Sequence, residues 1–207
     1  MNVVVLHVDD ACVVADKPSG LLSVPGRGEH LQDCVATRVQ AQFGDALVVH
    51  RLDMATSGLM LFARGIEAQR TLSRAFAQRE VHKRYVAVVH GRPDPDHGEI
   101  ALPLLADWPN RPLQKVDLEH GKPSLTRYRV VVTDDDRSRV VLEPVTGRAH
   151  QLRVHLLAIG YPIVGDALYA QPELLAGTER LLLHAASLRF AHPVSGDSIA
   201  IDSTVPF

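Results

Sequence analysis

Short runs of β-branched and other apolar residues, joined by tight turns, recur along the chain and constrain its fold. Runs at 3–8 and 11–15 flank Asp9-Asp10, and runs at 124–133 and 138–144 flank an acidic turn at 134–136. Two such runs around a short turn predict a β-hairpin, and hairpins build antiparallel sheets. Further strands are expected at 83–90, 100–105, 181–190 and 199–201.

Three segments have helical rather than strand-like spacing of apolar residues. Leu31, Val35, Val39 and Phe43 recur every four residues before Gly44, which predicts a helix over 31–43. Helices are also predicted over 67–78 and over 149–159, the second ending at Gly160. With roughly nine strands and three helices, the fold class is α+β with a largely antiparallel mixed sheet flanked by helices.

The 207 residues fit one large domain or two small ones, and 46% hydrophobic residues suffice for a buried core. The formal charge of −2 does not by itself indicate a nucleic-acid partner, but basic residues cluster at 82–84 and at 148–155. Cys12 and Cys34 lack metal-binding spacing, so neither a disulfide framework nor a zinc site is expected. No signal peptide or membrane-spanning run is apparent, so a cytoplasmic protein is expected.

One polar segment stands between two apolar runs at 48–62 and contains a single carboxylate, Asp53. The pattern predicts strand, loop, strand, with Asp53 on a loop held from both sides. Asp53, Thr56 and Ser57 could equally serve only to turn the chain. A second polar segment, 107–122, is predicted to be the longest irregular stretch, and loops of this length are usually functional or disordered.

Several common site patterns are absent from the sequence. There is no phosphate-binding loop, no serine-hydrolase elbow, no zinc-peptidase helix and no dinucleotide fingerprint. His50-Arg51-Leu52-Asp53 differs in order from the catalytic loop of protein kinases. His150 and His155, five residues apart on a predicted helix, fall on different faces, so a structural or RNA-contacting role is favoured over metal binding.

Five segments in register resemble the motifs of the RluA family of pseudouridine synthases, which isomerise uridine to pseudouridine in RNA. The 50–59 segment resembles that family's HRLDxxTSGL motif, and the other matches are KPSGL at 17–21, KRYVA at 83–87, GRAHQLRVH at 147–155 and LHA at 183–185. The resemblance covers nearly the whole chain. It implies the pseudouridine synthase fold, a single catalytic domain over 1–207, and a catalytic cleft across the sheet.

Within this family, the segment Asp107–Pro112 with Lys122-Pro123 resembles the loop of the members that modify both large-subunit ribosomal RNA and a tRNA anticodon stem-loop. The chain also begins directly at the catalytic motifs, without the S4-type domain that many relatives carry. Both features favour a dual-specificity enzyme.

The resemblance implies a catalytic set of Asp53, Tyr85 and Arg153. Asp53 matches the catalytic aspartate, which could add to the sugar or base covalently or abstract a ribose proton. Arg153 is expected to pair with Asp53 and keep it ionised, and Tyr85 to stack on a uridine flipped out of the RNA. No redox or group-transfer step is involved, so no cofactor or metal is expected.

RNA contacts are expected from five basic residues. Arg51 matches the residue that fills the space left by the flipped base, Arg148 is expected to contact phosphate, and the remainder of the set is Lys83, Arg111 and His150. The expected partners are structured rRNA and tRNA stem-loops, with no DNA, no membrane and a monomeric protein. Two alternatives stay open: a synthase acting on tRNA alone, and a catalytically silent RNA-binding or ribosome-assembly factor.

Overall fold

The computed structural model describes residues 3–175 and 177–207, and the chain divides into two compact units. The first unit runs to Lys83 and resumes over His184–Pro206, and the second comprises Arg84–Leu183 with Phe207. Strands β5 (His82–His90) and β11 (Leu183–Ala191) carry the chain between the units. The single domain over 1–207 stays a prediction.

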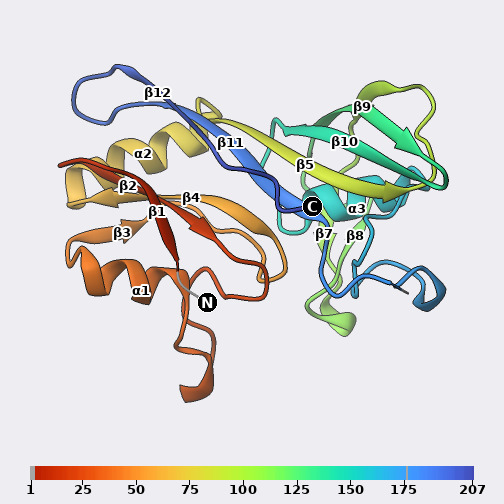
Figure 1. The fold of residues 1–207 in the computed structure, drawn as a ribbon, viewed down its shortest axis with the longest axis horizontal. Coiled ribbons are helices and arrows are strands. Elements are labelled where there is room, and N and C mark those ends of the chain that lie inside the picture. The colour runs from red at the N-terminus through yellow and green to blue at the C-terminus, as the bar shows by residue number, and fades with distance from the viewer. Residues whose placement is uncertain (1–2, 176) are drawn as a thin grey trace. The chain divides into compact units, whose positions relative to one another are not determined.

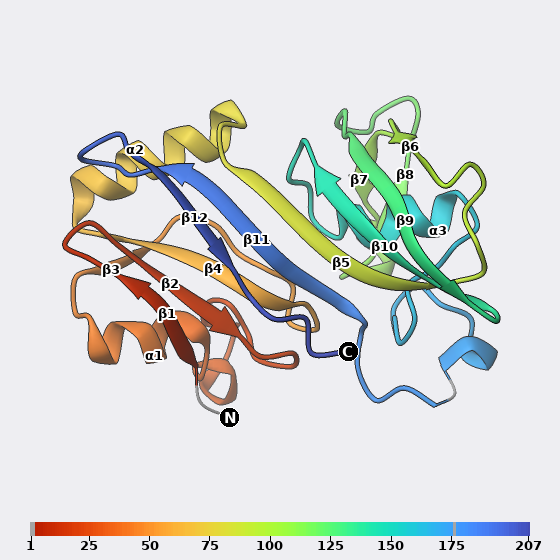
Figure 2. The ribbon, with the colours of Figure 1, turned by 45° about the horizontal axis from the view of Figure 1, so that its top comes forward.

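The first unit is a sheet with two helices (Figures 1 and 2). Strand β1 (Val4–Val8) pairs antiparallel with β2 (Cys12–Lys17), which pairs antiparallel with β4 (Ser57–Arg64). Strand β4 also pairs antiparallel with β3 (Ala46–Val48) and parallel with β11, and β11 pairs antiparallel with β12 (Ser198–Asp202). The predicted N-terminal and C-terminal strands and the 3–15 hairpin are therefore confirmed.

Helices α1 (Val35–Gln42) and α2 (Ile66–Gln78) belong to the first unit. Ala68 and Leu72 of α2 join Leu59, Leu61 and other apolar side chains of the sheet in one buried cluster. Strand β4, buried along nearly its whole length, is the centre of this core. A fully buried apolar strand is rigid, so residues at its N-terminal end are held in a fixed place.

In the second unit, strands β9 (Thr126–Asp134) and β10 (Arg137–Pro144) form the predicted hairpin, and β6 spans His97–Ile100. The strand order is β5-β10-β9-β6, each neighbouring pair antiparallel. A separate small hairpin joins β7 (Leu104–Ala106) to β8 (Gln114–Val116). Helix α3 (Gln151–Ala158) is the predicted third helix and contacts β8, β9 and β10.

Helix α1 begins later than predicted. Leu31 belongs to a short 3-10 helix, Glu29–Leu31, and Cys34 has extended backbone angles of φ −154° and ψ 171°. The Cys34 sulfur accepts the backbone N–H of Thr37, and the Thr37 hydroxyl accepts that of Cys34. This capping box fixes the start of the helix at Val35.

The strand predicted at 100–105 is wrong, because the chain leaves one ladder at Ile100 and enters another at Leu104. Between them the carbonyl of Leu102 accepts the Ser124 hydroxyl at 2.5 Å instead of a ladder partner. The prediction that 107–122 is irregular is also partly wrong, because the segment contains the 3-10 helix Trp108–Asn110 and strand β8. Short strands such as β3, β6, β7 and β8 explain why the predicted strand count was low.

None of the helices in the described part of the chain is both long and apolar enough to cross a membrane. Cys12 and Cys34 are both buried and free. The α+β class with a largely antiparallel sheet is confirmed.

Candidate active site

Asp53 lies on the loop between β3 and β4, so the predicted strand, loop, strand arrangement is confirmed. Leu52 is buried and anchors the loop, whereas Arg51 is exposed and Asp53 is partly buried. The carbonyl of Asp53 accepts the backbone N–H of Thr56 at 3.1 Å. This turn delivers the chain directly into the buried strand β4, and the Asp53 carboxyl group is therefore carried on a short, tethered segment.

The side chain of Lys17 is fully buried beneath this loop. Its Nζ donates to three backbone carbonyls, those of Pro18 at 2.9 Å, Leu21 at 2.6 Å and Met54 at 2.8 Å. A buried ammonium is costly unless its protons are hydrogen-bonded, and here carbonyl oxygens accept them. Lys17 thus ties the turn at 18–21 to the residue that follows Asp53.

Four further hydrogen bonds connect the two segments. The Ser23 hydroxyl donates to the carbonyl of Leu52 at 2.6 Å and accepts its backbone N–H at 3.0 Å. The Ser19 hydroxyl donates to the carbonyl of Ala55 at 2.7 Å, and the Gly20 N–H donates to that of Met54 at 2.9 Å. The residues on both sides of Asp53 are therefore held by one neighbouring turn.

Gly58 lies where β4 and β11 pair in parallel, opposite Ala185. Its φ is +111°, and a Cβ added there would overlap the backbone carbonyl of Ala185 and lie 2.6 Å from its nitrogen. Beside it, the Ser57 hydroxyl is 2.8 Å from Nδ1 of His184. The other ring nitrogen of His184 is 3.0 Å from the Ser203 hydroxyl, which donates to Asp16 at 2.6 Å. A series of hydrogen bonds from Ser57 to Asp16 thus fixes the start of β4, which follows the Asp53 loop.

His50 lies in the same loop, three residues before Asp53, and acts as an acceptor. Its Nε2 accepts the backbone N–H of Leu61 at 2.9 Å, and its ring stacks on Phe76 at 4.5 Å between centroids. Burial, reinforced by the positive charge of Lys83, lowers the pKa of His50 to about 3. Burial also lowers the pKa of Lys83. His50 is therefore neutral at physiological pH, as an acceptor must be.

In the second unit, Arg153 on α3 makes a two-pronged ion pair with Asp166. The Nε and Nη2 atoms lie 2.8 and 2.6 Å from the two carboxylate oxygens, and both side chains are almost fully buried. The Arg153 guanidinium carbon is also 5.0 Å from the centroid of the Tyr169 ring. A bidentate pair of this kind fixes the plane of the guanidinium.

Tyr169 also connects the start of α3 to the small hairpin. Its hydroxyl accepts the backbone N–H of Gln114 at 2.8 Å and lies 2.6 Å from Nδ1 of His150. His150 has left-handed backbone angles, φ 53° and ψ 16°, at the N-cap of α3. Tyr169 thus contacts both Arg153 and His150 and helps to position the two side chains within the second unit.

Comparison with known proteins identifies the family. The RNA pseudouridylate synthase family model matches residues 11–158. The chain is 54% identical over 205 residues to the dual-specificity RNA pseudouridine synthase RluA of Escherichia coli O6:H1, covering 99% of this chain and 94% of that protein. It is 48% identical to the protein of the same description from Pasteurella multocida, over 98% and 93% of the two chains.

The chain belongs to the RNA pseudouridylate synthase family.

Solved structures agree with this assignment. Human RNA pseudouridylate synthase domain containing 1 superposes with a TM-score of 0.84 at 27% identity, covering 100% of this chain and 84% of that one. Human domain containing 4 gives a TM-score of 0.78 at 25% identity, over 98% and 88%. The pseudouridine synthase fold, the isomerase class and an RNA substrate, all predicted from the five motifs, are confirmed.

The remaining residues predicted from the family motifs lie as follows. Tyr85 is partly buried on β5, opposite Leu142 of β10. Arg148 is exposed, and its guanidinium donates to the carbonyl of Pro123 at 3.3 Å. Arg111 is exposed in the hairpin between β7 and β8. His155, the other histidine of the α3 motif, is fully buried, with Nδ1 at 2.9 Å from the Thr126 hydroxyl, and is structural.

Sequence reasoning missed three residues of this pseudouridylate synthase. Asp166 and Tyr169, which hold Arg153, follow α3 in a loop without a periodic pattern. Trp108 was noted only as part of a motif, yet it is 63% exposed and lies under Arg111, whose guanidinium carbon is 4.0 Å from the ring centroid. Glycine at 165, beside Asp166, was the available signal of a sharp turn there. The pairing of Arg153 with Asp53 stays a prediction.

Proposed function

We propose that this enzyme converts specific uridines to pseudouridine in both large-subunit rRNA and the tRNA anticodon stem-loop. The observation that carries the proposal is the Asp53 loop, which Lys17, Ser19 and Ser23 hold on both sides. The relatives described as dual-specificity synthases, one of them 54% identical over almost the whole chain, support the pair of substrates.

The reaction rearranges bonds without adding or removing atoms overall. The bond from ribose C1′ to N1 of uracil breaks, the base turns, and C1′ bonds to C5. The hydrogen on C5 is lost to solvent and N1 gains one. In this proposal Asp53, as a carboxylate, either forms a transient covalent bond to the sugar or base or removes a ribose proton.

Tyr85 and Arg153 complete the proposed catalytic set. Tyr85 stacks on the flipped uracil, and Arg153 supplies a positive charge that keeps the carboxyl group of Asp53 ionised. The buried pair with Asp166 supports this role, because it holds the guanidinium rigidly without a contribution from RNA.

RNA binding in this proposal depends on Arg51, Lys83, Arg111, Arg148 and His150. Arg51 fills the position that the flipped base leaves, and its exposure beside Asp53 supports this role. Arg148 and Arg111 contact phosphate and unpaired bases, for which their exposed guanidinium groups are suited. We place this activity in the cytoplasm, which suits a protein with two free cysteines, and expect a monomer in solution by light scattering.

Tritium release from RNA labelled at uracil C5 tests the function directly. We expect release from both an anticodon stem-loop and a large-subunit rRNA fragment. Asp53→Ala should abolish it, because loss of a nucleophile costs on the order of 8 kcal/mol of barrier, roughly a millionfold in rate. Asp45→Ala, an exposed aspartate before β3, is the matched control and should retain full activity.

The outcomes separate the alternatives. Release from the stem-loop alone would limit the enzyme to tRNA. No release by the wild-type chain from either RNA would contradict the function, and measurable turnover by Asp53→Ala would contradict the role of that residue.

A further inference from the structure

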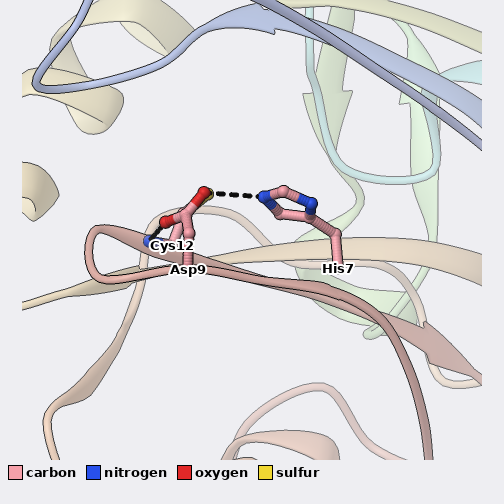
Figure 3. A group of neighbouring side chains, drawn as sticks. All are labelled: His7, Asp9 and Cys12. Atoms are coloured by element: carbon pink, nitrogen blue, oxygen red, sulfur yellow. Dashed lines mark hydrogen bonds and ion pairs between the residues drawn. The ribbon is translucent and has the colours of Figure 1, made fainter.

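A cluster of three potential metal ligands lies at the turn between β1 and β2. Nε2 of His7, a carboxylate oxygen of Asp9 and the sulfur of Cys12 are all within 4.8 Å of one another (Figure 3). Cys12 starts β2 and Lys17 ends it, so roughly 17 Å of strand separates this cluster from the lysine that holds the Asp53 loop. The cluster therefore has no part in the proposed catalytic set.

Asp9 is held in a single orientation by the hairpin turn. Its Oδ1 accepts the backbone N–H groups of Ala11 and Cys12, each at 2.8 Å. Its Oδ2 faces the other two ligands, 2.7 Å from Nε2 of His7 and 3.5 Å from the Cys12 sulfur. One oxygen is thus committed to the backbone and the other is directed at an imidazole and a thiol.

The imidazole, carboxylate and thiol differ in chemical softness, and this restricts which metal ions can bind to all three. Magnesium and calcium prefer oxygen ligands only, whereas imidazole nitrogen with thiolate sulfur and one carboxylate is a set that zinc and cobalt accept. Three protein ligands leave a fourth tetrahedral position for water.

We infer that the β1–β2 hairpin binds one divalent ion of the zinc class through His7, Asp9 and Cys12. Binding forms bonds from the ion to Nε2, Oδ2 and Sγ. The thiol proton of Cys12 is released to solvent. Nε2 of His7, which donates to Oδ2 of Asp9 in the structure, loses its proton while Nδ1 gains one from solvent, so the neutral ring offers its Nε2 lone pair to the ion. About one proton therefore leaves for each ion bound.

Two neighbouring side chains lie beside this site. Nδ1 of His192 accepts the backbone N–H of Ser195 at 3.0 Å, so in the neutral ring Nε2 bears the proton, 3.6 Å from Oδ2 of Asp9. At this distance His192 makes no hydrogen bond to the carboxylate, and with its proton on Nε2 it has no lone pair there to offer an ion. The guanidinium of Arg64 donates to the backbone carbonyl of Asp9 at 2.9 Å, so one positive charge already lies beside the site.

The ion would join the two strands of the hairpin at the margin of the core. Cys12 belongs to the buried apolar cluster that also contains Leu188 and Phe190. An ion that binds only the folded hairpin adds to the stability of the first unit and leaves the chemistry at Asp53 unchanged.

Cobalt titration of chelator-treated protein tests the site, because Co²⁺ bonded to thiolate has a charge-transfer absorption band. We expect one Co²⁺ per chain, the band, and release of about one proton. Cys12→Ser should abolish the band, and His7→Gln should weaken binding at least about 100-fold, since loss of even an outer-shell partner costs 10–100-fold. Cys34→Ser is the matched control, because Cys34 is also fully buried but its sulfur caps α1.

His7→Gln keeps the test decisive if Cys12→Ser does not fold, because His7 is partly exposed. Zinc should raise the melting temperature of the wild-type protein and not that of His7→Gln. The absence of a saturable thiolate band, a band that Cys34→Ser removes, or equal cobalt affinity in wild type and His7→Gln would each overturn the inference.

Discussion

Nζ of Lys17 lies 2.8 Å from the carbonyl oxygen of Met54, the residue that follows Asp53. This contact joins residues 37 positions apart and places a buried positive charge beneath the proposed catalytic loop. Lys17 of the KPSGL segment thus has a structural task, which is to hold the loop that carries Asp53.

Lys17→Met should therefore destabilise the protein and slow turnover. It removes the donor for three carbonyls, each of which costs about 1–3 kcal/mol when left unsatisfied, so the free energy of unfolding should fall by at least about 3 kcal/mol. Urea unfolding measures this loss. Lys115→Met, at an exposed position, is the control and should change stability by less than about 0.5 kcal/mol. Equal midpoints for the two variants would contradict the buried role.

Gly58→Ala should be far more damaging than Gly44→Ala. The added methyl at Gly58 would overlap the backbone of Ala185 in the neighbouring strand, and its φ of +111° disfavours alanine. At Gly44 nothing lies within 4 Å of the added carbon. We expect a loss of several kcal/mol for the first, in the range of other severe core changes, and near-neutral stability for the second. Thermal unfolding of both variants, with tritium release below the transition, compares them.

His50→Gln should reduce the acid sensitivity of the fold. The pKa of His50 is lowered from 6.5 to about 3, so between these values the unfolded chain binds a proton that the folded chain does not. Wild-type stability therefore rises with pH in this window and is lost on acidification, by up to about 1.4 kcal/mol per pH unit from this residue. Urea midpoints at pH 7, 6 and 5 measure the slope. An identical slope in His50→Gln would show that folding does not lower the pKa of His50.

The KPSGL segment and the segment around Asp53 also show how far the sequence can predict the candidate active site. The short polar segment between apolar runs located Asp53, because a loop between two strands is a local pattern. That Lys17 would be buried under it was not predictable from composition, since lysine is rarely buried and its acceptors are backbone carbonyls that no residue type reveals. The start of α1 was missed for a related reason, because apolar spacing continued through Cys34, whose backbone is extended.

The ion pair of Arg153 with Asp166 was harder to predict from the sequence. Arg153 and Asp166 are 13 positions apart, one on a helix and one in the loop after it. Helical spacing predicts partners three or four residues away and says nothing about a carboxylate that returns from a loop. The family motif named Arg153 but could not supply the side chain that holds it.

Asp166→Asn should show that the position of Arg153 depends on Asp166. Removing one partner of a buried pair leaves an uncompensated charge, and the free energy of unfolding should fall by about 3–5 kcal/mol. Turnover should fall as well, because the guanidinium of Arg153 loses its fixed plane. Asp33→Asn breaks the exposed pair of Asp33 with Arg38 and should leave both the urea midpoint and turnover close to wild type. Similar midpoints for the two variants would indicate that the Arg153 pair is not buried in solution.

Trp108→Ala should weaken RNA binding without slowing the chemical step. Trp108 is 63% exposed, and the guanidinium of Arg111 lies over its ring, so the pair presents a flat, positively charged surface at the tip of the small hairpin. Stacking of one base on an aromatic ring is worth roughly 1–3 kcal/mol, which corresponds to roughly a 5- to 150-fold loss of affinity.

Arg111→Ala should likewise raise KM more than it lowers kcat. Fluorescence anisotropy with a labelled stem-loop and single-turnover kinetics separate the two effects. Arg127→Ala, in an exposed pair with Glu99, is the control for loss of a surface charge. An unchanged KM in both hairpin variants would exclude this surface from RNA binding.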